Sequence, residues 1–580
     1  MIAVSEYSKQ VFSDLAPFRT GPEADNASEF AAALIASGLA HQKGGRLEHA
    51  ERCYLAALRI DPGNNEATYL MGVLALQSGN GGGALAYFAP VISRRQGDAD
   101  ALCNMGMANV LSLRLADAER WFEQALAVEP GHTTSRTGLA NICRMLGRVG
   151  EWTEHYRAAL RSTRVTPETY SKVLVALHSS PQMSLDELYS LHREWERRYA
   201  AEFYPRWPDH HNDPSVERKL RVGFVSGSFH ATIVGHFFRG VLGALRSSRG
   251  IEAFLYSSGT ASGWLSAELK NLSGCWCDVA ALDDDATAAR IRSDGVDILV
   301  DLDGHAPGNR LLVFARKPAP IQISWLDYFD TTGLEAIDYL ITDPTSTPAD
   351  TGQRFVERLI SMPSARLCFA APPFAPEVAP LPALATGQIT LGSFTRADKI
   401  GPNVIAVWAR ILAAIPDSRL VLKSGTLKFP EVRRHFEDAF ENHGIDPGRV
   451  LMRTASSYVQ LLTEYADVDI ALDSFPYNGG ATTCDALWMG VPVVARLGDS
   501  MISRQSAAIL GAAGLQSLIA RDDDEYVRIA AGLAADAPRL DALRKGLRPT
   551  IASSSLSDAH AFATAMVQRL RLVWSEWCTA

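Results

Sequence analysis

Apolar and polar positions follow two patterns along the chain, and the first is a 34-residue repeat in the N-terminal quarter. Three sets of small and aromatic residues share this spacing: Gly38, Gly72 and Gly106; Ala50, Ala84 and Ala118; Tyr54, Phe88, Phe122 and Tyr156. The small residues let paired helices approach closely, and the aromatic side chain fills the gap against the next repeat. This period is typical of the tetratricopeptide repeat, a helix–turn–helix unit. It predicts an α-solenoid.

The fourth unit of the array departs from the pattern, with Ala140 at the glycine position and Trp152 at the small-residue position. Terminal repeats that cap a solenoid are atypical in this way. A helical bundle with accidental spacing is the alternative. A solenoid presents a concave surface suited to an extended peptide or a partner helix, so the array predicts a protein-binding region.

Behind the repeats, after a helical stretch over residues 166–205, short apolar runs alternate with helical segments. The runs that indicate buried strands are residues 220–227, 252–259, 296–304, 320–328 and 338–343 in a first set, and 388–394, 418–425, 449–456, 468–475 and 491–497 in a second. Helices are predicted between them, for example over 236–248 and 285–294. This alternation predicts parallel sheets covered on both faces.

Residues 370–387 are rich in proline and alanine, show no helical or strand period and are predicted to be a linker. Two Rossmann-like halves joined in this way form a cleft, with ligands beyond the carboxyl ends of the strands. The predicted segments are an N-terminal segment (1–27), tetratricopeptide repeats (28–165), a helical connector (166–215), a first Rossmann-like domain (216–370), the linker (371–387), a second Rossmann-like domain (388–555) and a C-terminal helix (556–580). We expect that helix to pack back across both domains.

The composition is that of an ordinary globular protein, with 47% apolar and 21% charged residues among 580. Its 56 lysines and arginines against 65 aspartates and glutamates give a net charge of −9. This balance argues against binding of bulk nucleic acid, which needs a cationic face. Neither a secretory signal nor a run of about 18 apolar residues occurs, so we expect a cytoplasmic protein that spans no membrane.

The eight cysteines are scattered and include no CxxC pair, which indicates neither a zinc site nor a disulfide framework. Cys275 and Cys277 are the closest pair. We expect strand alternation to turn them to opposite faces. Free thiols fit a reducing cytoplasm.

The segment DIALDSFPYNGGATTCDALWMGVPVV (469–494) carries most of the candidate chemistry. A strand ends at Ser474, a glycine-containing loop follows, and Thr482 and Thr483 begin a helix. The start of a helix offers free backbone N–H groups and the positive end of its dipole, which suit a phosphate, and the threonines can cap it. Asp485 is placed to accept a hydrogen bond from a ribose hydroxyl. A simple capped helix is the alternative.

Three further loops at strand ends hold candidate residues. Lys399 lies between a strand and a helix, with Arg396 three residues earlier, although solvated surface lysines are far commoner than ligands. His305 follows a strand end in DLDGHAPGNR, where a structural histidine is the alternative. His230 and His236 lie in the exit loop of the first strand, SGSFHATIVGHFF.

Together these motifs resemble the O-GlcNAc transferase/SPINDLY-like glycosyltransferase family. The segments that carry the resemblance are LRVGFVSG…VGHFF, DGVDILVDLDGHAPGNRLLVFARKPAPIQISWLDY, LGSFTRADKI and LDSFPYNGGATTCDALWMGVPVV. With the repeats, the resemblance covers residues 28–160 and 216–578. It implies a GT-B fold and inverting transfer from a nucleotide-activated sugar to Ser or Thr. It also implies no essential metal and no cofactor besides the sugar nucleotide as co-substrate.

On this resemblance, Lys399 matches the lysine that contacts the donor diphosphate and offsets the charge of the leaving group. Thr482, Thr483 and Asp485 match the nucleotide-binding loop and helix, and Arg504 matches an arginine in the segment after it. The expected donor-binding set is Arg396, Lys399, Tyr477, Gly479, Gly480, Thr482, Thr483, Asp485 and Arg504, and the expected catalytic set is Lys399, His305 and His236. A cation and a helix N-terminus together stabilise a departing nucleotide.

The sequence departs from the family pattern at three places. Relatives read DFxxHxV in the first-strand loop, whereas here Ser228 and Thr232 stand at the acidic and histidine positions. Relatives read WLGYPxTTG where this chain reads WLDYFDTTG, with Asp327 at the glycine position. At the nucleotide loop, Gly480 and Ala481 replace His-Thr or Thr-Thr. These changes indicate either an altered donor or a catalytically silent relative.

We expect an active protein O-glycosyltransferase with an altered donor, whose repeats recruit the acceptor protein and whose cleft binds the sugar nucleotide. Flagellin is a candidate acceptor, and a nonulosonic acid carried on a cytidine nucleotide is a candidate donor. The alternative is a silent adaptor that binds protein partners through its repeats. A nucleotide-sugar epimerase would share the cleft but does not explain the repeats.

Overall fold

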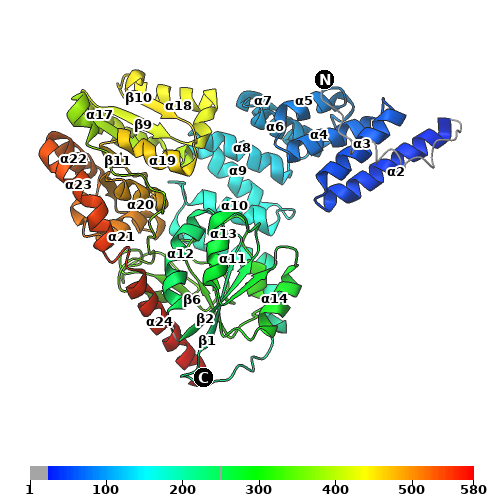
Figure 1. Cartoon of the computed structure of the whole chain (residues 1–580). Helices are drawn as coiled ribbons and strands as arrows, with labels where there is room; N and C mark the ends of the chain where they lie inside the picture. Colours follow the sequence, from blue (N-terminus) through cyan, green and yellow to red (C-terminus); the bar gives the residue numbers. More distant parts are fainter. Residues whose placement is uncertain (1–23, 249, 580) are drawn as a thin grey trace. The chain divides into compact units, whose positions relative to one another are not determined.

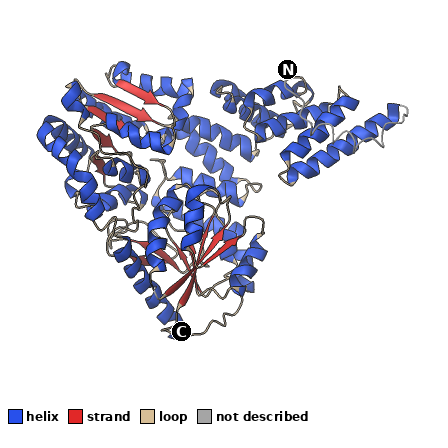
Figure 2. Cartoon of the chain, in the orientation of Figure 1, coloured by secondary structure: helices blue, strands red, loops and turns tan. Residues whose placement is uncertain are grey.

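The computed structural model describes residues 24–248 and 250–579 (Figure 1). The chain divides into two compact units, one ending at Ile142 and the other beginning at Cys143. Helices make up the first unit, whereas the second holds two parallel sheets with helices on their faces (Figure 2). Most of the N-terminal segment expected over residues 1–27 lies outside the described residues.

The first unit consists of helix pairs. Its helices are α2 (Ala24–Lys43), α3 (Leu47–Ile60), α4 (Asn65–Gln77), α5 (Gly81–Phe88), α6 (Ala99–Leu111), α7 (Leu115–Val128) and the first part of α8 (Thr133–Met145). A Cβ added at Gly38 would lie 2.4 Å from a Tyr54 ring carbon, and one at Gly106 would lie 2.5 Å from Phe122. Phe122 also approaches Gly138 of the next pair. These close approaches confirm the predicted tetratricopeptide repeats.

This packing predicts the effect of adding one methyl group. Gly72→Ala would place its Cβ 2.4 Å from a Phe88 ring carbon, so we expect the free energy of unfolding of the first unit to fall by about 1–3 kcal/mol. Urea titration followed by circular dichroism measures the change. Gly82→Ala, in the same helix pair, is the control, because nothing lies within 4 Å of its added Cβ. Equal unfolding midpoints for the two variants would contradict the packing.

Three helices precede the first sheet in the second unit. They are α9 (Val149–Arg161), α10 (Pro167–Leu177) and α11 (Leu185–Tyr199). The side chain of Thr166 caps α10 by accepting a hydrogen bond from the backbone N–H of Thr169 at 3.2 Å, and Pro167 stands at the first helical position. Ser184 caps α11 in the same way. Local sequence therefore fixes where both helices begin.

The first lobe is the seven-stranded sheet of the second unit together with the helices on it. The sheet is parallel, with the order β3-β2-β1-β4-β5-β6-β7. Its strands are β1 (Leu220–Ser226), β2 (Ile251–Ser257), β3 (Cys275–Asp278), β4 (Ile298–Asp301), β5 (Ile321–Ser324), β6 (Tyr339–Thr342) and β7 (Arg358–Ser361). Its helices are α12 (Ile233–Arg246), α13 (Gly263–Leu272), α14 (Asp284–Ser293) and α15 (Leu311–Ala315). All the strands predicted for this lobe are present.

The sequence pattern does not reveal β3 and β7, because both are short, partly exposed strands at the two edges of the sheet. The expectation for Cys275 and Cys277 is wrong. Residues i and i+2 of a strand share a face, and the two Sγ atoms lie 3.6 Å apart on β3. None of the eight cysteines, all of which lie within the described residues, forms a disulfide.

The second lobe is the six-stranded sheet with its helices, and its order is β10-β9-β8-β11-β12-β13. Its strands are β8 (Thr390–Ser393), β9 (Arg419–Lys423), β10 (Val450–Arg453), β11 (Ile470–Leu472), β12 (Val493–Arg496) and the unpredicted β13 (Ile519–Ala520). Its helices are α17 (Pro402–Ala414), α18 (Pro430–Glu441), α19 (Tyr458–Glu464), α20 (Ala481–Trp488), α21 (Gln505–Ala512), α22 (Asp523–Ala535) and α23 (Ala537–Ser553). The strand order reverses between β1 and β4 in one sheet and between β8 and β11 in the other, which creates a crevice in each. These two sheets confirm the predicted Rossmann-like halves of a GT-B fold.

Two segments join the lobes. The expected linker holds a short helix, α16 (Pro382–Thr386), which ends at Gly387 in the left-handed conformation. The last helix, α24 (Ala559–Thr579), packs against α12 of the first lobe, where Arg571 donates hydrogen bonds to the carbonyl oxygens of Val216 (2.7 Å) and Gly250 (2.8 Å) (Figure 1). The chain thus returns to the first lobe after completing the second. None of the described helices is long and apolar enough to cross a membrane.

Candidate active site

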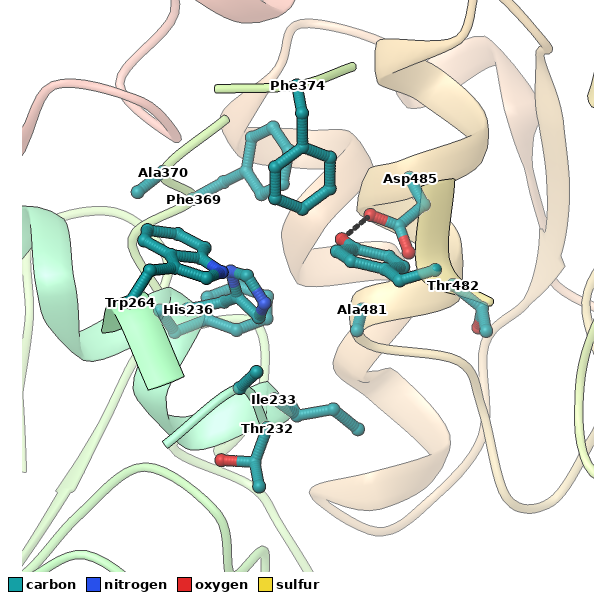
Figure 3. Close-up of a pocket in the computed structure, with 13 residues that line it drawn as sticks. Thr232, Ile233, His236, Trp264, Phe369, Ala370, Phe374, Ala481, Thr482 and Asp485 are labelled. Carbon is teal, nitrogen blue, oxygen red and sulfur yellow. Dashed lines mark hydrogen bonds between the residues drawn. The ribbon is translucent and has the colours of Figure 1, made fainter. Parts of the chain in front are cut away.

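A cavity of about 440 Å³ lies between the two lobes (Figure 3). The first lobe contributes the start of α12 and Trp264 of α13, and the linker contributes Phe374. The second lobe contributes Tyr458 of α19 and the first turn of α20. The aromatic rings give the cavity a largely apolar wall, and Asp485 and Thr482 place polar atoms on the opposite side (Figure 3).

The first turn of α20 has no side-chain cap. Gly480 is the N-cap residue, so the expectation that the threonines cap this helix is wrong. Thr483 is buried, and its hydroxyl lies 2.9 Å from the hydroxyl of Ser506. Thr482 lines the cavity. The uncapped backbone N–H groups at this helix start suit a phosphate, as the sequence predicts.

The loop before α20 is held so closely that only glycine fits at residue 479. The backbone N–H of Gly479 donates to Asp473 Oδ1 at 2.7 Å, and its carbonyl accepts from Gln505 Nε2 at 3.2 Å. A Cβ added there would lie 2.6 Å from the hydroxyl oxygen of Thr483 and 2.7 Å from that of Thr482. Hydrogen bonds to Asp473 and from Gln505 therefore fix the backbone of the loop at the carboxyl end of β11.

Lys399 reaches this loop from the carboxyl end of β8. Its Nζ donates to the carbonyl of Asn478 at 3.2 Å and lies 3.7 Å from the centroid of the Tyr477 ring. Burial and the neighbouring Arg396 lower the pKa of Lys399, while Asp473 opposes that shift. The strand order reverses between β8 and β11, and the loops that follow these two strands meet at the ammonium group of Lys399. Ligands bind at this position in sheets of this kind.

Two buried oxygens beside Lys399 have no hydrogen-bond partner among the described residues. They are Oδ2 of Asp473 and Oδ1 of Asn478. Buried polar atoms in proteins are nearly always hydrogen-bonded, so an unpartnered pair points to a ligand that supplies donors. Hydroxyl groups of a sugar are donors of this kind.

Arg396 is exposed and lies beside the same loop, with its Nε 3.3 Å from Asp398 Oδ1. Arg144, at the C-terminal end of α8, contacts the other oxygen of Asp398 at 3.0 Å. One carboxylate therefore ties the last repeat to the short turn, Ala397–Lys399, that carries Lys399. Ion pairs of this kind fix a loop more than they add stability.

Asp485 faces the cavity from α20. Its Oδ1 accepts a hydrogen bond from the hydroxyl of Tyr458 at 2.8 Å (Figure 3). Burial raises the pKa of Asp485 to about 7. Tyr458 was not among the residues predicted from the sequence, because nothing in its local pattern shows that α19 turns toward α20.

Comparisons with known proteins agree with this architecture. The profile of Glycosyl transferase family 41 matches residues 202–369 and 382–566, and a tetratricopeptide repeat profile matches residues 35–100. The chain belongs to glycosyl transferase family 41. The match covers both lobes and most of the residues that line the cavity, but not Ala370 and Phe374 of the linker region.

Family 41 relatives in plants and animals are longer than this chain. A probable UDP-N-acetylglucosamine–peptide N-acetylglucosaminyltransferase SPINDLY of Oryza sativa subsp. japonica is 37% identical over 418 residues, which cover 70% of this chain and 44% of the rice protein. A UDP-N-acetylglucosamine–peptide N-acetylglucosaminyltransferase of Caenorhabditis elegans is 24% identical, covering 62% of this chain and 41% of the nematode protein. The chain thus spans less than half the length of these relatives.

A solved structure is similar over nearly the whole chain. A mutant of the Thermobaculum terrenum O-GlcNAc transferase is 33% identical with a TM-score of 0.79, and the match covers 96% of this chain and 99% of that one. The match therefore extends over the repeats and both lobes of this chain.

The first-lobe histidines expected at this family 41 site have different surroundings. His236 lines the cavity, with its ring centroid 5.2 Å from that of Tyr458, and its Nδ1 has no partner among the described residues. Burial lowers the pKa of His236, so it is neutral near pH 7. Thr232, at the family histidine position, caps α12 and donates to the carbonyl of Ser228 at 2.8 Å. Its hydroxyl therefore has a structural role.

The catalytic role expected for His305 does not fit its position. The ring is fully buried and does not line the cavity. Its Nδ1 lies 2.8 Å from the hydroxyl of Ser171, and its Nε2 lies 2.8 Å from the carbonyl oxygen of Thr332. Burial holds the pKa of His305 well below its usual range. His305 joins α10 to the first lobe.

The same junction contains one group of side chains with metal-ligand types. Ligand atoms of His178, His192 and Asp330 lie within 4.8 Å of one another. Both ring nitrogens of His192 are already engaged, with the Leu188 carbonyl at 2.6 Å and the Tyr328 hydroxyl at 2.6 Å. Hydrogen bonds therefore account for this cluster, and the absence of an essential metal stays a prediction.

Two arginines form hydrogen bonds between the lobes, and of these Arg366 is buried whereas Arg504 is partly exposed. Arg504, expected to bind the donor, does not line the cavity, and its Nη1 donates to the carbonyl of Thr345 at 3.4 Å. Arg366 was not predicted, because it stands in an apolar run without a motif. Its Nη1 donates to the carbonyl of Leu326 at 2.9 Å and its Nη2 to Gln505 Oε1 at 2.9 Å.

Proposed function

We propose that the protein is a protein O-glycosyltransferase that moves a sugar from a nucleotide-activated donor to a serine or threonine hydroxyl of an acceptor protein. The observation that carries the proposal is Lys399, a cation held beside the Asn478 carbonyl just before the uncapped start of α20. Relatives named as UDP-N-acetylglucosamine–peptide transferases support the reaction class.

The cavity and the loop beside it support a role for each group of the proposed donor site. The ammonium group of Lys399 and the N–H groups of α20 stabilise the negative charge that develops on the leaving nucleotide phosphate. Asp485 accepts from a ribose hydroxyl, and the rings of Trp264 and Tyr458 offer apolar faces to the base. In this proposal the lysine and the helix supply the positive charge without a metal, and a single displacement inverts the anomeric carbon.

The acceptor is the second part of the proposal. A tetratricopeptide array binds extended peptides, and Arg144 connects its last repeat to the donor turn through Asp398. We propose that the repeats recruit the acceptor protein. Flagellin is a candidate acceptor, and a nonulosonic acid on a cytidine nucleotide is a candidate donor to include beside uridine and guanosine sugars.

Nucleotide binding tests the proposal first. Uridine, guanosine and cytidine nucleotides and their sugars are each added to the purified protein, and its thermal midpoint is measured. One nucleotide class is expected to raise the midpoint, because a ligand at 100 times its Kd stabilises the bound state by about 2.7 kcal/mol. No shift with any of them would contradict a donor site.

A silent adaptor is the second candidate, and Thr232 is the observation that favours it. The imidazole of the family pattern is missing there, and the hydroxyl that replaces it caps a helix. This candidate predicts a repeat-dependent protein partner and no sugar transfer. Nucleotide binding with measurable transfer excludes it.

A further inference from the structure

Aspartates gather at the carboxyl ends of β4 and β5, on the cleft side of the first lobe. Asp301, the last residue of β4, is fully engaged: it accepts from the backbone N–H groups of Asp303 (3.2 Å) and Gly304 (2.9 Å) and from the hydroxyl of Ser324 (3.2 Å). Its carboxylate therefore shapes the loop after β4. These three hydrogen bonds account for the buried carboxylate of Asp301 without a ligand.

Asp303 is engaged in the same way. It accepts from the hydroxyl of Ser226 at 2.6 Å and from the backbone N–H of Gly227 at 2.8 Å. These bonds join the exit loops of β1 and β4. Both carboxylates hold the edge of the sheet in place, and each has hydrogen bonds from this chain on both of its oxygens.

Asp327 differs from both. No described residue donates a hydrogen bond to its carboxylate, and the side chain is partly exposed. Only its backbone is fixed, through the N–H that donates to the carbonyl of Leu302 at 3.1 Å. Asp327 also replaces the glycine of the family pattern, so its carboxylate is a property of this chain.

The backbone before Asp327 is strained. Leu326 has a φ of +91°, which residues other than glycine rarely adopt. Such strain persists only where surrounding structure imposes it, and it clusters at functional sites. Arg366 imposes it here by holding the Leu326 carbonyl, and Arg366 in turn contacts Gln505, whose Nε2 donates to the carbonyl of Gly479. The strained turn is therefore tied to the donor loop of the other lobe.

The turn that holds Asp327 lies beside the donor turn, because the Phe329 ring contacts the Tyr477 ring, with centroids 5.0 Å apart, and Tyr477 contacts Lys399. Burial raises the pKa of Asp327 to about 6. Two arginines lower that pKa: Arg366, and Arg396 of the second lobe. The other titratable groups that interact with it are Asp301, Asp303 and Tyr477. The carboxylate is ionised at pH 7, and a base works best when its pKa lies near the working pH.

We propose that Asp327 is the general base of the transfer reaction, taking the proton of the acceptor hydroxyl. This rests on the proposed function. As the proton moves to the carboxylate, the hydroxyl oxygen forms its bond to the anomeric carbon. The bond from that carbon to the phosphate oxygen breaks, and its electron pair leaves with the nucleotide beside Lys399. Asp327 then returns the proton to water.

His236 is the rival base, because its neutral ring lines the cavity. The closing experiment therefore compares Asp327→Asn and His236→Asn over pH 5 to 8. Asp350→Asn is the control, since it removes one exposed carboxylate from the same lobe. For each variant kcat, KM and the Kd of the nucleotide product are measured, together with the thermal midpoint.

Asp327→Asn is expected to lower kcat by about 10²–10⁴-fold, to leave the nucleotide Kd within threefold and to keep the thermal midpoint, because no side-chain hydrogen bond is lost. Wild type should lose activity as the pH falls through about 6, and this acid limb should be absent from the residual activity of the variant. Asp327→Glu should recover part of the rate. If Asp327→Asn does not fold, the proposal is still tested by the loss of wild-type activity at low pH and by the kcat of Asp327→Glu.

Three results would overturn the proposal. Asp327→Asn with more than a third of the wild-type kcat and an unchanged acid limb would exclude the role, as would loss of that limb in His236→Asn instead. A matched loss of nucleotide affinity in Asp327→Asn would assign the residue to donor binding. Wild-type protein that neither binds a nucleotide nor transfers a sugar would instead overturn the proposed function, and this inference with it.

Discussion

Lys399→Met is expected to lower kcat for sugar transfer by about 10²–10³-fold, as removal of one electrostatic stabiliser of a transition state does. Methionine fills a similar space beside Tyr477 but has no charge for the leaving phosphate. The variant loses the hydrogen bond to the Asn478 carbonyl, so its thermal midpoint is measured beside its kinetics. Steady-state kinetics with the preferred donor measures the effect.

The control for this variant is Lys428→Met, which removes an exposed lysine from the same lobe and should leave kcat unchanged. The charge argument also predicts a pH dependence. Burial and Arg396 lower the pKa of Lys399, so the lysine loses its proton at a lower pH than usual. Transfer should therefore fall as the pH rises through that pKa, and Lys399→Met should lack this basic limb. Undiminished transfer by Lys399→Met would remove the lysine from the mechanism.

Arg366→Met is expected to weaken both stability and catalysis. Arg366 is fully buried and donates to the Leu326 carbonyl and to Gln505, so its loss leaves one buried and one partly buried acceptor without their donor. Hydrogen bonds from a charged group contribute about 1.5–3 kcal/mol each. We expect the free energy of unfolding to fall by about 3 kcal/mol, measured by urea titration.

The same variant should move the acid limb of transfer. Arg366 lowers the pKa of Asp327, so removing it raises that pKa and shifts the loss of activity to higher pH. Arg354→Met, which removes a mostly exposed arginine of the same lobe, should change neither property. An Arg366→Met variant with wild-type stability and an unchanged pH dependence at low pH would contradict the role of Arg366 in joining the two lobes.

Much of the fold is predictable because its signals are local. Gly38 and Tyr54 mark a repeat by spacing, and the structure places one against the other. Central strands such as β1 and β4 are mostly apolar and buried, which makes them visible in the sequence. The edge strands β3 and β7 are short and partly exposed, so they carry no comparable pattern.

The site is less predictable, since it depends on contacts between distant segments. Thr482, Asp485 and His236 stand at element ends that the topology brings to one cavity, and Lys399 contacts the loop just before α20. His305 lies at an equally suggestive strand end, but α10 covers it.

The contacts that tie the lobes together leave no local signal. Arg366 bonds partners far apart in the chain, and no motif marks it. The strain at Leu326 that presents Asp327 is likewise visible only in three dimensions.

Intact mass spectrometry of an acceptor protein tests the central claim most directly. The acceptor, with flagellin as the first choice, is incubated with the wild-type protein or Lys399→Met and with each uridine, guanosine and cytidine sugar nucleotide. We predict a mass increase in whole multiples of one sugar residue, with one donor class, that is nearly lost with Lys399→Met. An acceptor mass unchanged by wild-type protein with every donor, or an increase that Lys399→Met reproduces in full, would contradict the account.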